Sequence, residues 1–289
     1  MEMLFRCNII ALVGGGKSPR YPPNKVMLWD DHLSRCVGEL CFRTEVKAVK
    51  LRRDRIAVAL EHKIYVYNFD DLHLLDTVET CHNPRGLCCM SALPTSPVLA
   101  CPDRLKGHVR LQLYCYERTV LISAHESSVA CLALNKDGNL LATASDKGTL
   151  VRIFQTSEGQ LLQEVRRGID RAEIYCLAFD SLSKWLACSS DKGTIHIFAV
   201  KSEQVESRNP TSTFSFMKRL LPKYFDSEWS FSQFRVPDVR TVCAFGPTPG
   251  TLVVVSQEGV YYLATFDPEV SGDCTQHVVK QLKDEDMHT

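Results

Sequence analysis

The chain has 289 residues, of which 45% are hydrophobic, so it is long and apolar enough to bury a large core and is not expected to be disordered. Its 34 Lys and Arg residues balance its 34 Asp and Glu residues, which excludes the global basic field that nucleic-acid-binding proteins use. Recognition of an anion would therefore have to be local.

The N-terminal residues 1–13 are partly apolar but include charged side chains, so we expect neither a signal peptide nor a membrane-spanning segment there. Residues 14–18, Gly-Gly-Gly-Lys-Ser, resemble the end of a nucleotide-binding P-loop, but Ala11 stands where that motif begins with glycine. Pro19 follows at once and disfavours the helix that a P-loop needs. We therefore predict a surface loop here.

Further along, short runs of β-branched, aromatic and aliphatic residues alternate with Asp-Gly, Asp-Lys-Gly or Glu-Gly turns, which is typical of antiparallel strands. Ser145–Thr149 recurs unchanged as Ser190–Thr194, 45 residues later, and the flanking runs repeat with it. This period matches one four-stranded propeller blade of about 40–45 residues. Roughly twenty-four candidate strands make about six blades. We therefore predict an all-β, WD40-like β-propeller that forms a single domain over residues 1–289. The repeated runs cover residues 128–134, 140–144, 150–154, 174–179, 185–189 and 195–198, and weaker copies cover residues 55–67, 107–114 and 251–263.

The thirteen cysteines are scattered without a Cys-x-x-Cys pair, and most lie in apolar runs. We interpret them as reduced, buried side chains of an intracellular protein, and we predict no metal site and no cofactor. The sequence also contains no Gly-x-Ser-x-Gly elbow, no His-Glu-x-x-His motif and no distinctive pair of carboxylates. It therefore gives no support for an enzyme.

The adjacent residues Arg166 and Arg167 are the strongest candidates for anion recognition, since they end a predicted strand just before Gly168. Neighbouring side chains of a strand point to opposite sides, so each arginine can serve a separate pocket. A guanidinium donates two parallel hydrogen bonds to phosphate oxygens and stays charged at any cellular pH. The alternative is that the pair is merely solvated, as most exposed Arg-Arg pairs are.

The repeated turns on either side of the arginines favour binding over solvation, because they bring hydroxyl groups and positive charge. Lys192 and His196 are expected to add charge. Asp146 and Asp191 belong to the ordinary turn of WD-type blades, and we expect them to be structural. The candidate ligands besides the arginines are His125, Ser145, Thr149 and Arg152 before them, and Ser190, Lys192, Thr194 and His196 after them.

From residue 201 to about residue 237 the strand pattern breaks into a long insertion rich in aromatic and basic residues. An exposed loop of this composition is an apolar patch of the kind that binds a partner or a membrane, with its lysines drawn to anionic lipid. The alternative is a return to the core, which we expect for residues 236–245 and which also fits Phe231 and Phe234. The predicted membrane-inserting side chains are Phe214, Phe216, Leu220, Leu221, Tyr224, Phe225 and Trp229.

Arg166-Arg167-Gly168 resembles the Phe/Leu-Arg-Arg-Gly signature of PROPPINs, seven-bladed propellers that bind phosphatidylinositol 3-phosphate and phosphatidylinositol 3,5-bisphosphate. Val165 stands where that family usually has Phe or Leu. The resemblance extends from about residue 5 to residue 263, and the other similar segments are residues 12–16, 22–30, 83–88, 142–152 and 221–225.

The resemblance implies two lipid sites that flank the arginine pair. One would contain Arg166 with His125, Ser145, Thr149 and Arg152, and the other Arg167 with Ser190, Thr194 and His196. It also implies that the insertion is the family's membrane-inserting loop.

The resemblance further implies a non-enzymatic adaptor recruited to membranes during autophagosome formation. Its implied partners are phosphoinositide-containing membranes and an autophagy lipid-transfer protein, with Asn83, Pro84 and Arg85 in a candidate docking loop. We expect no nucleic-acid partner, a monomer, and a cytoplasmic location at preautophagosomal, endosomal or vacuolar membranes.

The start of the chain departs from the family, because the family's first blade has no counterpart before Met1. We therefore expect about six blades of a family seven, with an unpaired edge where the ring would close. The competing hypothesis for function is a WD-repeat scaffold that binds only proteins. It predicts that both arginines are dispensable and that the loop aromatics contact a polypeptide.

Overall fold

The computed structural model of the chain describes residues 1–93, 95–201, 208–210, 228–237 and 239–282. These residues form six sheets and one short 3₁₀-helix, and no α-helix occurs among them. The chain divides into two compact units, residues 1–126 and residues 127–289.

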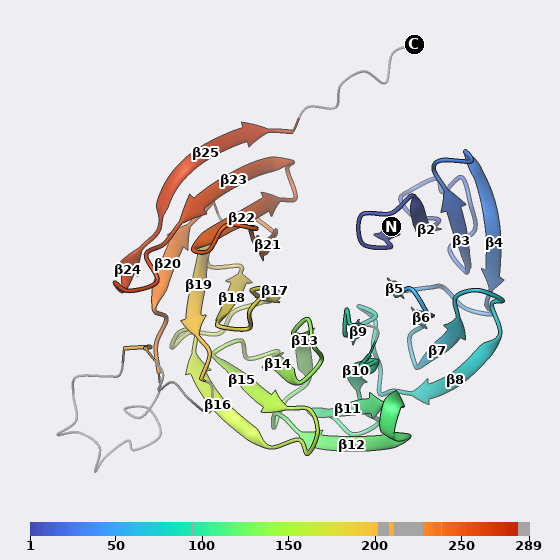
Figure 1. Cartoon of the computed structure of the whole chain (residues 1–289), viewed down its shortest axis with the longest axis horizontal. Helices are drawn as coiled ribbons and strands as arrows, with labels where there is room; N and C mark the ends of the chain where they lie inside the picture. Colours follow the sequence, from blue (N-terminus) through green and yellow to red (C-terminus); the bar gives the residue numbers. More distant parts are fainter. Residues whose placement is uncertain (94, 202–207, 211–227, 238, 283–289) are drawn as a thin grey trace. The chain divides into compact units, whose positions relative to one another are not determined.

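The first unit contains three antiparallel sheets, each a meander of four consecutive strands (Figure 1). Successive side chains of a strand point to opposite faces, so the side chains of β11 are alternately buried and partly exposed, with Val109 and Leu111 fully buried. One buried cluster joins the first and second sheets, and another joins the second and third. The elements are β1 (Glu2–Met3), β2 (Ile9–Val13), β3 (Lys25–Asp30), β4 (Arg35–Cys41), β5 (Ala48–Leu51), β6 (Arg55–Ala59), β7 (Lys63–Asn68), β8 (Leu74–Glu79), β9 (Cys89–Met90), β10 (Val98–Pro102), β11 (His108–Leu113), the 3₁₀-helix η1 (Tyr114–Tyr116) and β12 (Arg118–Ser123).

The second unit contains the β13–β16 sheet, the β17–β20 sheet and a third sheet of β21–β23 with β25. The strands are β13 (Val129–Leu134), β14 (Leu140–Ser145), β15 (Leu150–Gln155), β16 (Leu161–Arg166), β17 (Ile174–Phe179), β18 (Trp185–Ser190), β19 (Thr194–Ala199), β20 (Ser232–Arg235), β21 (Thr241–Phe245), β22 (Thr251–Ser256), β23 (Val260–Thr265), β24 (Gly272–Asp273) and β25 (Thr275–Gln281).

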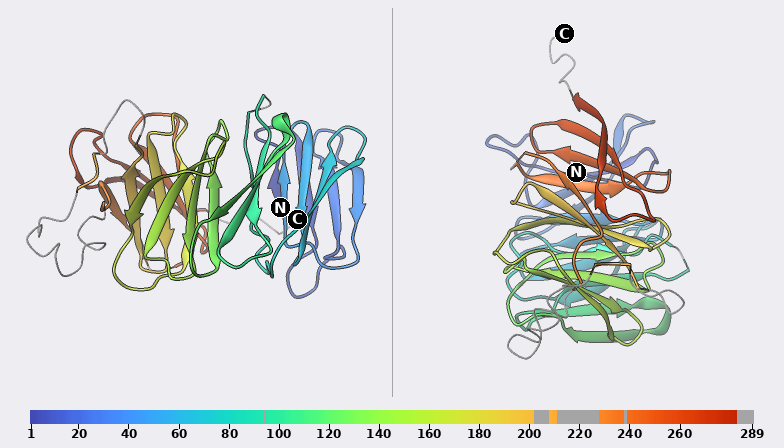
Figure 2. Two further views of the ribbon diagram at one scale, coloured as in Figure 1. Left: turned by 90° about the horizontal axis from the view of Figure 1, so that it is seen from below. Right: turned by 90° about the vertical axis from the view of Figure 1, so that its left-hand side faces the viewer.

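Within the second unit the β13–β16 sheet and the β17–β20 sheet lie side by side (Figures 1 and 2). Val151, Val165, Cys188 and Phe198 belong to one buried cluster shared by these two sheets. The opposite face of the β17–β20 sheet packs on the third sheet through a cluster that includes Ile195. Because each fully buried aliphatic or aromatic side chain stabilises the fold by roughly 1.5–3 kcal/mol, these clusters fix which face each strand residue occupies.

The repeated Ser-Asp-Lys-Gly-Thr segments connect β14 to β15 and β18 to β19, as their period predicted. Gly148 and Gly193 have φ angles of 64° and 61°, in the left-handed region that glycine adopts at low cost. At Gly148 a Cβ would lie 1.9 Å from the carbonyl oxygen of Ala172. The first repeated turn is therefore packed tightly against the segment that follows the arginine pair.

The β17–β20 sheet carries a fifth strand that the sequence did not predict. β24 pairs in parallel with β20, and Ser232 lies opposite Gly272. The Ser232 hydroxyl donates to the Gly272 carbonyl at 2.7 Å, and the Gly272 amide donates to the Phe231 carbonyl at 3.1 Å. The chain thus leaves β23, covers the edge of β20 and returns to the third sheet as β25.

The all-β architecture predicted from the sequence is confirmed by these sheets. Phe231 and Phe234 are both 4% exposed and pack in the core, as the alternative interpretation of the insertion's end expected. All thirteen cysteines carry free thiols. In the part of the chain that the structure describes, no helix is long and apolar enough to cross a bilayer, and no group of three or more His, Cys, Asp or Glu residues suits a metal ion.

Candidate anion-binding site

The two arginines lie at the end of β16 and face opposite sides of the β13–β16 sheet. Arg166 is the last residue of the strand and lies opposite Leu150 of β15. Arg167 follows Val165 with the two-residue period of the strand, so it continues the face that packs against the β17–β20 sheet. The structure therefore contains the separation of the two side chains that strand geometry predicted.

Arg167 is a buried cation held by backbone oxygens. Its side chain Nε donates to the Gly148 carbonyl at 2.9 Å, and Nη2 donates to the Asp170 carbonyl. Burial lowers the pKa of Arg167, but an arginine titrates so far above neutral pH that it stays charged. These two hydrogen bonds hold the guanidinium in place. Nη1 forms no hydrogen bond with the described residues, so its N–H groups are open to an anion.

Ser145, Arg152 and Arg166 share the other face of the β13–β16 sheet. Arg152 lies opposite Thr143, two positions from Ser145, and opposite Glu164, two positions from Arg166. The sequence reasoning missed Glu164. Arg152 Nε donates to Glu164 Oε2 at 2.7 Å, so a phosphate on this face would have to compete with a carboxylate for Arg152. Only part of the signal was available: Glu164 precedes Arg166 by two residues, which places both on one side of a strand, but the pairing with Arg152 depends on the register between two strands.

The other two residues predicted for the site of Arg166, Thr149 and His125, do not share this face of the sheet. Thr149 lies just before β15, and its carbonyl accepts the backbone N–H of Arg167 at 2.9 Å. His125 belongs to the first unit, where it is buried directly after β12 and its backbone N–H donates to the Gly107 carbonyl at 3.0 Å. The part that His125 plays in a site stays a prediction.

Ser190, Thr194 and His196 occupy the face of the β17–β20 sheet that turns toward Arg167. His196 lies opposite Cys188, which belongs to the cluster between the two sheets. Ser190 ends β18 and Thr194 begins β19. The four residues predicted for the site of Arg167, which we call the second set, thus come from two facing sheets of one unit. They are Arg167, Ser190, Thr194 and His196.

His196 is neutral, so the expectation that it adds positive charge is wrong. The ring is only 9% exposed, and its Nδ1 lies 3.1 Å from the Ser230 hydroxyl. Burial, followed by the positive charge of Arg167, lowers the pKa of His196 to about 4. At neutral pH His196 therefore offers a hydrogen-bonding ring and no charge.

Lys192 stands in the exposed turn between Ser190 and Thr194. Its ammonium lies 3.7 Å from the carboxylate of Asp191. Asp191 also accepts the backbone N–H of Glu173 at 3.0 Å, which confirms the structural role expected for that aspartate. Lys192 supplies charge at the rim of the second set.

The base of the long insertion is fastened to β16 by four polar residues, Gln163, Lys201, Asn209 and Glu228, which we call the Glu228 clamp. The buried Glu228 carboxylate accepts hydrogen bonds from Gln163 Nε2 at 2.7 Å and Asn209 Nδ2 at 3.0 Å, and it pairs with Lys201 Nζ at 2.5 Å. The Glu228 carbonyl accepts the backbone N–H of Arg166 at 2.7 Å. The clamp therefore connects the insertion directly to the strand that ends in the arginines.

The insertion itself lies mostly outside the described residues. Trp229 is described: it is partly buried beside the clamp, and its backbone N–H donates to the Pro210 carbonyl at 2.9 Å. The other predicted membrane-inserting residues lie outside the described ranges, namely Phe214, Phe216, Leu220, Leu221, Tyr224 and Phe225.

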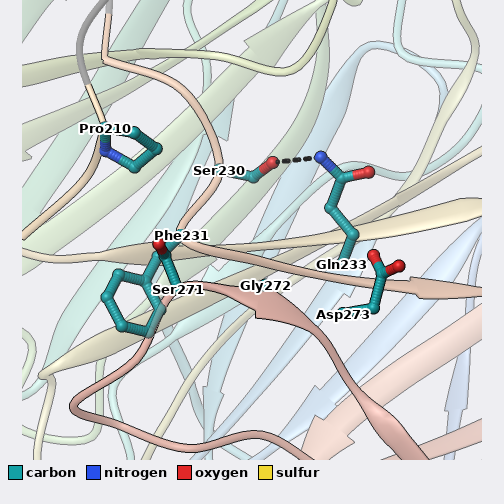
Figure 3. A pocket seen from close by; sticks show the side chains of 7 residues that line it. All are labelled: Pro210, Ser230, Phe231, Gln233, Ser271, Gly272 and Asp273. Carbon is teal, nitrogen blue, oxygen red and sulfur yellow. Dashed lines mark hydrogen bonds between the residues drawn. The ribbon is translucent and has the colours of Figure 1, made fainter.

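A cavity of about 200 Å³ lies at the base of the insertion, beside β20 and β24 (Figure 3). Gln233 Nε2 donates at 3.0 Å to the Ser230 hydroxyl that also contacts His196. The cavity is below the roughly 300 Å³ of the smallest typical ligand pockets, and the carboxylate of Asp273 lines it, so it does not suit an anionic headgroup. It is lined by Pro210, Ser230, Phe231, Gln233, Ser271, Gly272 and Asp273.

The candidate docking loop is braced from within. Asn83 is 2% exposed, and its side chain accepts the Leu87 amide at 2.7 Å and donates to the Leu87 carbonyl at 3.1 Å. Pro84 and Arg85 between them are exposed. Asn83 therefore shapes the loop, and Pro84 and Arg85 are the residues that the loop presents.

Comparison with known proteins gives a consistent result. The PROPPIN family model matches residues 1–282. Autophagy-related protein 18e of Arabidopsis thaliana is 44% identical over 278 residues, which cover 95% of this chain and 74% of that relative.

The solved structures that resemble the chain agree with that match. Hsv2 of Kluyveromyces marxianus is 26% identical with a TM-score of 0.77, covering 97% of this chain and 84% of that one. A complex of KlAtg21 with the coiled coil of AgAtg16 has a TM-score of 0.78 at 22% identity, covering 97% of this chain and 84% of the other, a likeness of fold. These structures confirm the predicted β-propeller fold.

Proposed function

The chain belongs to the PROPPIN family, and from that premise we propose that it is a non-enzymatic adaptor that binds phosphatidylinositol 3-phosphate and phosphatidylinositol 3,5-bisphosphate on membranes where autophagosomes form. The observation that carries the proposal is the arginine pair. Arg166 and Arg167 face opposite sides of one sheet, and Arg167 is held as a permanent cation opposite Ser190 and Thr194.

The donors around Arg167 suit a phosphate on a polar ring. A guanidinium already oriented by two backbone carbonyls loses little conformational freedom when a phosphate arrives. The hydroxyls of Ser190 and Thr194 can donate to phosphate or accept from ring hydroxyls, and neutral His196 adds a further polar group without repelling Arg167.

Two weak headgroup sites and an inserting loop would act together on one membrane. Once one site is occupied, the other elements meet the same surface at a high effective concentration, so avidity exceeds the affinity of either site alone. The Glu228 clamp supports this arrangement, because it fastens the insertion to the backbone of Arg166.

Flotation with phosphatidylinositol 3-phosphate vesicles tests the proposal. The double variant Arg166→Thr/Arg167→Thr should bind at least about tenfold more weakly, since each charge-assisted hydrogen bond contributes roughly 1.5–3 kcal/mol. Arg43→Thr/Arg53→Thr removes the same amount of charge from two exposed arginines outside the site and should float like the unaltered chain. Circular dichroism checks that all variants are folded.

The same experiment distinguishes the competing scaffold. Equal flotation of both double variants, or no flotation of a folded unaltered chain, would refute lipid binding by the arginines. The scaffold that binds only proteins would then be the better account.

The exposed Pro84 and Arg85 are the residues we propose for docking an autophagy lipid-transfer protein, presented by a loop that Asn83 holds in shape. In the KlAtg21 complex the partner is the coiled coil of AgAtg16. Bound to lipid and to protein, the adaptor would be found in the cytoplasm and at preautophagosomal, endosomal or vacuolar membranes.

A further inference from the structure

Arg235, which the sequence reasoning did not select, lies at the end of β20 beside the second set of candidate ligands. It is exposed, and its guanidinium forms no hydrogen bond or ion pair with the described residues. Two other strand arginines are paired by contrast, Arg152 with Glu164 and Arg110 with Asp103. Arg235 is therefore an available cation in a defined place.

The register of the sheet places Arg235 on the binding face. Arg235 lies directly opposite Thr194, and Gln233 lies opposite His196. Opposite residues of an antiparallel pair share a face, so the Arg235 side chain lies on the side of Thr194 and His196, toward Arg167. Phe234, between Gln233 and Arg235, packs into the cluster on the other face, which fixes this assignment.

Two rows of side chains cross this face, and the side chains of only one row form hydrogen bonds with other described residues. His196 and Gln233 both contact the Ser230 hydroxyl, at 3.1 and 3.0 Å. In the next row, the hydroxyl of Thr194 and the guanidinium of Arg235 have no hydrogen-bond partner among the described residues. With adjacent strands 4.7–4.9 Å apart, the row from Ser190 to Arg235 is about 10 Å long.

We propose that Arg235 is a specificity-determining residue of the second site, where it binds a second phosphate and makes the site prefer inositol bisphosphate headgroups to monophosphates. Arg167 belongs to the facing sheet, and Arg235 stands at the end of the row, next to Thr194. A monophosphate can engage one guanidinium, whereas a bisphosphate can engage both. This inference rests on the proposed lipid function and adds a preference to it.

The test compares Arg235→Gln with the unaltered chain on two kinds of vesicle. Binding to phosphatidylinositol 3,5-bisphosphate vesicles should fall about tenfold, the effect of one lost charge-assisted hydrogen bond, and binding to phosphatidylinositol 3-phosphate vesicles should change less than about twofold. The matched control is Arg118→Gln, which removes another exposed arginine from the end of an edge strand, β12, and should change neither affinity.

Competition identifies the ligand as a headgroup. Soluble inositol 1,3,5-trisphosphate should displace the unaltered chain from bisphosphate vesicles, and inorganic phosphate at the same concentration should not. Equal competition by phosphate would indicate a simple anion site and would overturn the preference.

The remaining outcomes are also decisive. An equal loss on both lipids, the same loss in Arg118→Gln, or no loss at all would overturn the role of Arg235 while leaving the lipid function standing. Binding of neither lipid by the unaltered chain would overturn the lipid function and, with it, this inference.

Discussion

His196 lies buried beside Arg167 and carries no charge at neutral pH, which makes its environment sensitive to acid. A histidine whose pKa is lowered by folding binds a proton more readily in the unfolded chain. Stability from such a group is fully present above the ordinary histidine pKa and is lost as the pH falls toward the folded value. For His196 the window runs from about pH 6.5 down to about 4.

The variant His196→Gln should therefore flatten the pH dependence of stability. We expect the unaltered chain to lose roughly 2 kcal/mol of unfolding free energy through His196 between about pH 7 and about pH 4.5. Glutamine can still hydrogen-bond Ser230 but does not titrate, so the variant should lack this loss. Urea unfolding at several pH values measures both chains, and parallel curves would contradict the assignment.

At the level of single residues, strand alternation was enough to predict that Arg166 and Arg167 face different sides. The charge state of His196 was not predictable, because it depends on burial between two sheets that only the folded chain brings together. The pairing of Arg152 with Glu164 was missed for a different reason. It follows from a cross-strand register that local sequence does not fix.

Among the elements, β16 is the strand on which the site and the insertion depend. One edge of β16 pairs with β15. At its end, β16 also forms a parallel bridge in which Val165 lies opposite Glu228. The clamp buries a carboxylate whose partners come from three stretches of chain, so removing that carboxylate leaves several donors unsatisfied.

We expect Glu228→Ala to lower the free energy of unfolding by about 2–4 kcal/mol, because a buried, hydrogen-bonded charge pair is broken from one side. The matched control is Glu269→Ala, which removes the ion pair between Arg208 and an exposed glutamate and should cost less than about 1 kcal/mol. Denaturant titration of both variants gives the comparison. Equal costs would show that the clamp is no stronger than a surface pair.

The elements that the sequence predicted best are β14, β15, β18 and β19, since turn chemistry and alternation are local and occur twice in the same form. The strand β24 was not predicted, because it has two residues and pairs in parallel with a strand far back in the sequence. The orientation of β20, and with it the place of Arg235, could not be read from an aromatic-rich insertion with no clear period.

For the whole molecule, the balance of 34 basic and 34 acidic residues limits how it can meet a membrane. A neutral molecule has no net positive field to draw it to anionic lipid, and because fields decay over about 8 Å at physiological ionic strength, the lysines of the insertion attract such lipid only locally. We therefore expect much weaker flotation with vesicles of phosphatidylcholine and phosphatidylserine that lack phosphoinositides. Flotation equal to that with phosphatidylinositol 3-phosphate would contradict headgroup recognition.

The closing strand β24 also sets an order of events during synthesis. Its partner in β20 lies 40 residues earlier in the chain. At about 5–20 residues per second, a ribosome needs roughly 2–8 seconds to make that stretch. During this interval the edge of β20 is a bare template to which a strand of another nascent chain can pair. The yield of folded protein should therefore depend on polysome crowding and chaperone supply, even though the finished fold covers this edge.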